Sequence, residues 1–157
     1  MERKRHRIFL DSNVILSGLF SGAGAPRLIL DLLCLDLPAL TGLTGRFNLM
    51  EIERNLEKKM PAALPAYQKY LPLLKLEVIP LPSREDLRPL SGAAEEKDLP
   101  VLASALNGGA DYLVTGDKKL LSLISRKGGF PFKTVSPSEF LDKALPEILA
   151  GKPGNSI

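Results

Sequence analysis

The sequence predicts an α/β protein whose mainly parallel sheet of about five strands is covered by helices on both faces. Short apolar runs of the kind that form buried strands alternate with longer stretches of helical periodicity. Such alternation is typical of parallel sheets, whose strands are apolar throughout because both faces are buried. The length of 157 residues fits one domain, and 45% apolar residues are enough for a packed core.

The N-terminal part of the chain is predicted to form one strand and two helices. Residues 8–10 are an apolar run that ends at Asp11, which indicates a buried strand. Residues 13–19 continue in a helical pattern until a segment rich in glycine interrupts it. The next helix is expected to start at Pro26, which suits a first helical turn, and to run through Leu35.

The middle of the chain is predicted to alternate strands and helices. A strand at 37–43 has the weaker signal, since a proline and a glycine interrupt it. Residues 47–59 and 62–74 have helical patterns, and a proline that suits a first turn precedes the second. The apolar run at 76–81 predicts another strand.

The C-terminal part begins with a polar, acidic segment at 82–97 that is expected to be irregular. A helix at 99–106, capped by Asp98, and a strand at 111–115 are expected next. Asp117 is expected to begin a helix at 118–124, and a strand at 132–135 follows it. The last element is a helix that Ser136 or Ser138 caps and that ends at Leu149. Residues 1–150 are therefore expected to form a single domain, and 151–157 a flexible tail.

Composition excludes several classes of function. The single cysteine, Cys34, allows no internal disulfide and no zinc site built from thiolates. The single histidine, His6, excludes a mechanism that needs two. No apolar stretch reaches the ~18–20 residues that cross a bilayer, so a cytoplasmic protein without membrane contact is expected. The net charge is only +3, although residues 3–7 form a basic run that could contact phosphate or simply be solvated.

Three aspartates stand where a predicted strand ends or a helix begins. Asp11 and Asp117 each follow a strand, and Asp98 opens a helix. Asp98 and Asp117 could be plain helix caps, since the free N–H groups and the helix dipole favour a carboxylate there. Together the three are a stronger signal, because ligands bind outside the carboxyl ends of the strands of such sheets.

The fourth acid is Glu51 or Glu53, on the helix predicted at 47–59. Being two residues apart, they point about 200° away from each other, so only one can enter a given site. Glu53 lies nearer the apolar stripe, whereas Glu51 shares a polar track with Asn48 and Asn55. Periodicity alone does not choose between them, and either could lie on a solvated helix face.

Four converging carboxylates imply a cation between them. Without a cation they repel one another, and an unpaired buried carboxylate is costly. Oxygen ligands favour Mg²⁺ or Mn²⁺ over zinc. Two such ions ~3.5–4 Å apart can activate water and stabilise a leaving oxygen, which suits phosphodiester hydrolysis without a histidine or a covalent nucleophile.

A resemblance to the PIN domain family is carried by three segments: IFLDSNVILSGL, LMEIERNL and KDLPVLASALNGGADYLVTGDKKLL. The chain is most similar to the branch of toxin ribonucleases of toxin–antitoxin pairs, over roughly residues 7–142. The resemblance implies a three-layer α/β/α sandwich and a metal-dependent nuclease that acts on RNA with Mg²⁺ or Mn²⁺. It also implies an antitoxin partner and a homodimer.

The resemblance also implies roles for individual residues. The family's glutamate is followed by an apolar residue and, five positions on, by a leucine, which fits Glu51 rather than Glu53. Asn13 and Thr115 match polar positions that order metal ligands or water. The chain departs from the pattern before the glutamate, where Gly45-Arg46-Phe47 replaces a serine or threonine. The implied catalytic, metal-binding acids are Asp11, Glu51, Asp98 and Asp117.

Two other functions are weighed against a nuclease. One is a PIN-like module that binds RNA or a protein without cutting, against which the four acids argue. The other is a phospho-receiver domain, which needs two acids after the first strand and a lysine after the last. The chain instead has Asp11-Ser12, and Lys133 precedes Val135. Three cations could contact RNA phosphate or simply be exposed: Arg46, Lys118 and Lys119.

Overall fold

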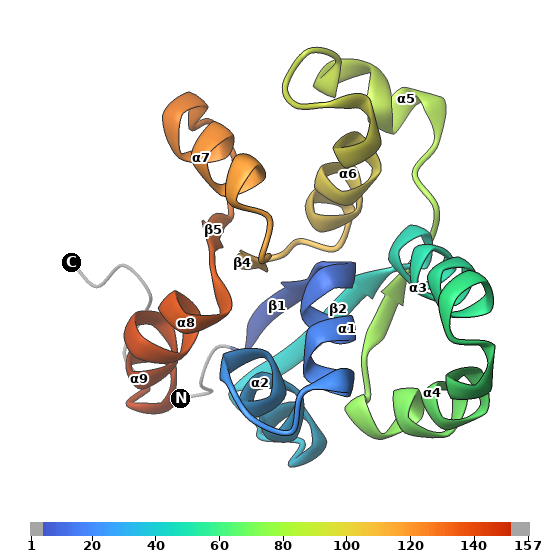
Figure 1. Ribbon diagram of the computed structural model, residues 1–157. Coiled ribbons are helices and arrows are strands. Elements are labelled where there is room, and N and C mark those ends of the chain that lie inside the picture. The colour runs from blue at the N-terminus through green and yellow to red at the C-terminus, as the bar shows by residue number, and fades with distance from the viewer. Residues whose placement is uncertain (1–4, 152–157) are drawn as a thin grey trace.

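Five parallel strands form a single sheet in the computed structural model, which describes residues 5–151 (Figure 1). The strands are β1 His6–Leu10, β2 Leu40–Gly45, β3 Glu77–Ile79, β4 Tyr112–Val114 and β5 Lys133–Val135. Their spatial order is β3-β2-β1-β4-β5, and every neighbouring pair is parallel. The predicted parallel sheet is thus confirmed. Part of the basic run at 3–7 and most of the tail at 151–157 lie outside the described residues.

Helices cover both faces of this sheet and complete the predicted three layers. Their bounds are α1 Ser12–Phe20, α2 Ala25–Cys34, α3 Arg46–Lys59, α4 Leu64–Tyr70, α5 Arg84–Leu87, α6 Leu99–Asn107, α7 Lys118–Lys127, α8 Pro137–Glu139 and α9 Leu145–Leu149. Figure 1 shows α7 and β5 at one end of the sheet and α3 and α4 at the other.

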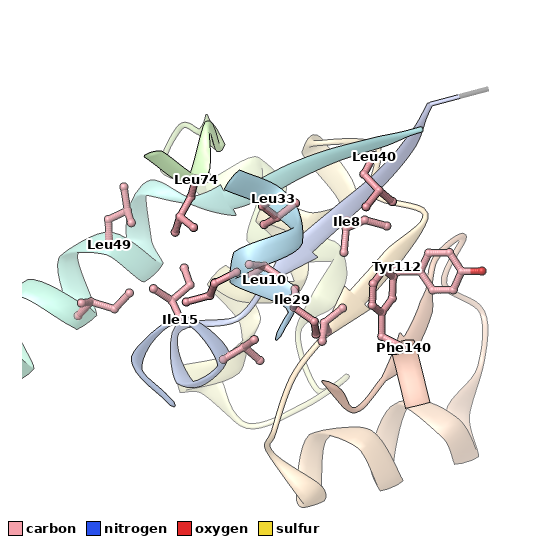
Figure 2. Close-up of a cluster of buried hydrophobic side chains, with 14 of the residues drawn as sticks. Ile8, Leu10, Ile15, Ile29, Leu33, Leu40, Leu49, Leu74, Tyr112 and Phe140 are labelled. Carbon is pink, nitrogen blue, oxygen red and sulfur yellow. The ribbon is translucent and has the colours of Figure 1, made fainter. Parts of the chain in front are cut away.

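The core is divided into two clusters by the sheet. Side chains of β1 alternate, so that Ile8 and Leu10 join one cluster and Phe9 joins the other. The first cluster, shown in Figure 2, contains side chains of α1, α2 and α3, and Tyr112 meets Phe140 edge to face with ring centroids 5.8 Å apart. The second contains side chains of α6 and α7. Burial on both faces explains why the inner strand β4 and residues 8–10 of β1 are apolar throughout.

Prolines account for two differences from the expected elements. The strand expected at 37–43 is β2, which begins three residues later, after Pro38. The helix expected at 62–74 is divided into two short 3₁₀ helices, Pro61–Ala63 and Leu71–Leu74, on either side of α4. Proline stands within the first two positions of each piece, because it lacks the N–H that a continuous helix would need.

The segment expected to be irregular at 82–97 is more ordered than its composition suggests. Ser83 and Asp86 form a capping box that starts α5, and 3₁₀ turns follow at Arg88–Leu90 and Glu96–Asp98. Ser136, one of the two predicted caps, starts α8, which continues through a π-helical stretch, Phe140–Ala144, into α9.

The order of the strands determines where a ligand can bind. From β1 the chain moves outward through β2 to β3, and it then returns to place β4 on the other side of β1. Ligands of open parallel sheets bind at such a reversal, outside the carboxyl ends of the strands. Asp11 directly follows β1, and Thr115 directly follows β4.

Within residues 5–151, no single helix is long and apolar enough to cross a membrane; α1 and α2 qualify only jointly, across a 93° bend.

Candidate active site

An acidic pocket with a volume of about 220 Å³ opens at the carboxyl ends of β1 and β4. All four predicted acids line it, although they come from four separate segments of the chain. The lining residues are Asp11, Ser12, Asn13, Leu16, Glu51, Asn55, Lys97, Asp98, Val101 and Asp117. The structure therefore brings together the residues that the sequence predicted to meet.

Asp11 is the most constrained of these acids. It is the N-cap of α1, is only 7% exposed, and accepts a hydrogen bond from the backbone N–H of Ser12 at 2.8 Å. Oδ1 also accepts from Asn48 Nδ2 at 3.1 Å. Oδ2 accepts from Thr115 Oγ1 at 2.7 Å and from Asn13 Nδ2 at 3.3 Å. Thus Asn13 and Thr115, predicted as supporting polar residues, both contact Asp11 directly.

A short chain of hydrogen bonds links Asp11 to Glu51. Asn48 Nδ2 donates to Ser12 Oγ at 2.9 Å as well as to Asp11. Ser12 Oγ in turn donates to Glu51 Oε1 at 2.9 Å. Asn48 is fully buried and Ser12 is nearly so. We call this chain the Asn48–Ser12 relay; it orients the Asp11 and Glu51 carboxylates relative to each other.

Glu51 and Glu53 lie on different faces of α3, and only one of these faces meets the pocket. Glu51 lines the acidic pocket, whereas Glu53 does not. Instead, the Glu53 charge acts on the buried Tyr67 of α4, where burial first and this charge second raise the pKa of the phenol to about 12. The two glutamates thus face different sides of α3, and Glu51 is the one at the pocket.

Asp98 and Asp117 begin helices in different ways. Asp117 caps α7 as expected, because its Oδ1 accepts from the N–H groups of Lys119 at 3.0 Å and Leu120 at 3.1 Å. Asp98 precedes α6 but makes no capping hydrogen bond, since its backbone is already helical, with φ −94° and ψ −13°. Asp98 therefore stands at the predicted N-cap position of α6 but lacks the side-chain hydrogen bond of a cap. Its carboxylate is not committed to the helix and is available at the pocket.

The pocket disfavours negative charge on two of its acids. Burial raises the pKa of Asp11, and the nearby charges of Glu51 and Asp117 add to this effect, although hydrogen bonds from Thr115 and Ser12 oppose it. Burial also raises the pKa of Asp98, with a further contribution from the charge of Asp117. Carboxylates in this situation are stabilised in their ionised form by a nearby cation.

The basic residues predicted to contact substrate lie outside the pocket lining. Arg46, Lys118 and Lys119 are exposed on the surface, and none lines the pocket. Lys97 lines it instead, and sequence reasoning did not select it. Nor did it assign a role to Ser12. Asn48 had a usable signal, because it precedes Glu51 by three residues on the same polar track of α3.

Comparison with known proteins assigns a family to this site. The chain matches the PIN domain over residues 7–119, a range that contains all four acids. The chain belongs to the PIN domain family. No curated protein matches its sequence.

Two solved structures share the PIN fold seen here. A chain in a crystal structure of VapBC2 from Rickettsia felis, bound to a DNA fragment from its promoter, is 18% identical with a TM-score of 0.59. The match covers 83% of this chain and 98% of that one. A chain in a structure of VapBC-1 from nontypeable Haemophilus influenzae is 14% identical with a TM-score of 0.52, and 84% and 98% are covered. At these identities the likeness extends to the fold alone.

The chemistry of the pocket fits a hard divalent cation. The four acids provide oxygen ligands, which Mg²⁺ and Mn²⁺ prefer. Within residues 5–151, no three acidic, histidine or cysteine side chains are arranged to hold an ion by themselves. Mg²⁺ is usually bound through one or two carboxylates and keeps several waters, so it does not need a complete protein cage.

Proposed function

We propose that this PIN domain is a metal-dependent ribonuclease that hydrolyses RNA phosphodiester bonds with Mg²⁺ or Mn²⁺. The observation that carries the proposal is the convergence of four acids on one pocket at the reversal of strand order. This set of oxygen ligands suits phosphoryl chemistry. The lone histidine, His6, belongs to β1 and does not line the pocket.

In this proposal, one set of side chains ligates the metal, and a second set orients those ligands by hydrogen bonds. Asp11, Glu51, Asp98 and Asp117 would ligate the metal directly or through its waters. When bound, the cation supplies activation of water and neutralisation of the charge that develops on the phosphate. The Asn48–Ser12 relay, together with Asn13 and Thr115, keeps Asp11 and Glu51 oriented.

The proposal includes a toxin role with an antitoxin partner. Both structural matches above are chains of VapBC proteins, and the chain shares their fold. We also propose a homodimer, which light scattering on the purified protein tests directly. A monomer at working concentration would exclude the dimer while leaving the nuclease proposal intact.

The decisive experiment is cleavage of a panel of labelled single-stranded and structured RNAs in Mg²⁺, in Mn²⁺ and in EDTA. Cleavage should require metal and should fall by about a hundredfold or more in Asp98→Asn. Asp142→Asn is the matched control, because Asp142 is exposed and does not line the pocket. Cleavage that persists in EDTA or in Asp98→Asn would contradict the proposal.

A further inference from the structure

A second hollow lies at the end of the sheet, next to the C-terminal turns of α7. It has a volume of about 310 Å³ and is bounded by α7 and the edge strand β5. Its lining includes Ile124, Ser125, Phe130, Phe132, Lys133 and Thr134. α7 begins directly after Asp117 of the acidic pocket and has ten residues, a length of about 15 Å. This helix therefore connects the two cavities.

The exposed face of α7 carries positive but no negative charge. The helix sequence, KKLLSLISRK, contains four cations and no acid. Lys118, Ser122 and Ser125 are four and then three residues apart, so they form one track along the helix, and all three are exposed. Leu120 and Ile124 bury the opposite face. The track leads from Lys118, which directly follows Asp117 of the acidic pocket, to Ser125, which lines the hollow.

The hollow presents an aromatic surface, and a buried hydroxyl without a partner lies in its wall. Phe130 stacks on the buried Phe132 with ring centroids 5.2 Å apart and planes 27° apart, and Phe130 itself is only half-buried. Thr134 Oγ1 is buried and has no hydrogen-bond partner within the described part of the chain. Lys133 is exposed at the same strand. A flat ring placed on Phe130 would extend the stack in a hollow that the exposed Lys133 also lines.

We propose that α7 and this hollow form a binding track for single-stranded RNA, in which Lys118 contacts phosphate and a base stacks on Phe130. Positive charge along the backbone path combined with aromatic stacking is typical of sites for single-stranded nucleic acid. Asp117 already accepts hydrogen bonds from the N–H groups of Lys119 and Leu120, so the Lys118 side chain rather than the start of the helix contacts phosphate. The inference rests on the proposed function, since the occupant is the substrate strand that enters the acidic pocket.

Fluorescence anisotropy with a labelled oligonucleotide of about twelve nucleotides tests the track. The protein is measured in EDTA, which prevents metal-dependent cleavage. Phe130→Ala should weaken binding about tenfold to a hundredfold, the range for one lost base stack. Lys118→Glu should weaken binding and lower the slope of affinity against salt by about one. Ser125→Glu should also weaken binding. Because Ser125 is exposed, this variant tests the track independently of whether Phe130→Ala folds.

Two variants are matched controls. Phe20 is 51% exposed at the end of α1, and Lys59 is exposed at the end of α3, so neither Phe20→Ala nor Lys59→Glu touches the track. Both should bind as the wild type does. The inference is overturned if Lys118→Glu and Ser125→Glu bind normally, or if the wild type binds an acidic peptide rather than RNA. It is also overturned if Phe130→Ala instead dissociates a dimer in light scattering.

The outcomes separate this inference from the nuclease proposal. Binding that depends on the track without any cleavage in Mg²⁺ or Mn²⁺ would retain the track and reject the nuclease. Cleavage by the wild type with normal RNA binding by all three variants would retain the nuclease and reject the track.

Discussion

Asp11 and Asp98 line the same pocket, yet the protein holds them in opposite ways. Asp11 is buried and accepts hydrogen bonds from four neighbouring residues, whereas Asp98 makes no capping hydrogen bond. Burial raises the pKa of both carboxyl groups, and neighbouring acids raise it further. The folded protein thus keeps repulsive charge at one place, which a divalent cation would relieve.

Asp98→Asn should therefore raise the free energy of unfolding of the metal-free protein at neutral pH. Because the folded-state pKa of Asp98 is above its ordinary value of 3.8, ionisation of this group opposes folding at pH values above the folded pKa. That cost is lost as the pH falls through the folded pKa. Urea unfolding between about pH 7 and pH 3 should show the advantage of the variant shrinking to nothing. A pH-independent difference would contradict this assignment.

Ser12→Ala should weaken metal affinity and should lower the free energy of unfolding only moderately. The change removes the hydroxyl that connects Asn48 to Glu51, and it should cost about 1–3 kcal/mol of stability. Losing such a contact behind a metal ligand typically weakens metal affinity about 10–100-fold. A titration of cleavage against Mn²⁺ measures this shift. Ser17→Ala, at an exposed position of the same helix, should leave both quantities unchanged.

At the scale of elements, α3 decides where Asn48 and Glu51 lie. It begins directly after Gly45, whose φ of −94° any residue could adopt. Gly45 is needed for space instead, because a Cβ there would lie 2.8 Å from Asn48 Oδ1 and 2.9 Å from Ser104 Oγ. Ser104 belongs to α6, the helix that follows Asp98. This close contact sets α3, which carries Glu51, against α6, which follows Asp98.

Gly45→Ala should therefore disturb both stability and the site. The added methyl group must displace Asn48 or Ser104, at a cost of about 1–3 kcal/mol. Urea unfolding measures that cost, and cleavage should fall because Asn48 orients Asp11. The control is Gly22→Ala, since a Cβ at Gly22 meets nothing within 4 Å. Equal free energies of unfolding for the two variants would show that a Cβ at position 45 fits beside Asn48 and Ser104.

At the scale of the whole molecule, the pocket exists only when distant segments have assembled. Its acids belong to the start of α1, to α3, to the turn before α6 and to the start of α7. Parallel pairing of β1 with β4 brings the first and last of these together. The proposed metal binding would therefore be linked to folding, because the unfolded chain has no such arrangement.

Mn²⁺ should accordingly raise the melting temperature of the wild-type protein. A ligand at about 100 times its Kd adds ~2.7 kcal/mol, which corresponds to several degrees for a domain of this size. Glu51→Gln should reduce the shift, whereas Glu53→Gln should retain it, because Glu53 faces away from the pocket. Differential scanning fluorimetry with and without EDTA measures the effect. Equal shifts in the two variants would contradict the placing of Glu51.

Sequence reasoning was most successful where local pattern and physical necessity agree. Apolar strands that end in Asp11 or lead to Asp117 predicted both the parallel sheet and the acids at its edge. It failed where prolines divided the helix expected at 62–74, because helical periodicity continues across breaks in hydrogen bonding. Asp98 occupies the expected N-cap position of α6, but its side chain makes no capping hydrogen bond because its backbone is already helical.

The sequence by itself determined the α/β class, the strand-end acids and the resemblance to the PIN family, because each of these depends on residues close together in the chain. Helical periodicity left Glu51 and Glu53 open and the resemblance implied Glu51, which the tertiary structure places in the lining of the pocket. Only the tertiary structure revealed the Asn48–Ser12 relay, the Lys97 side chain and the hollow beside Phe130. These features arise where segments far apart in the sequence meet, and local periodicity contains no information about which side chains share that space.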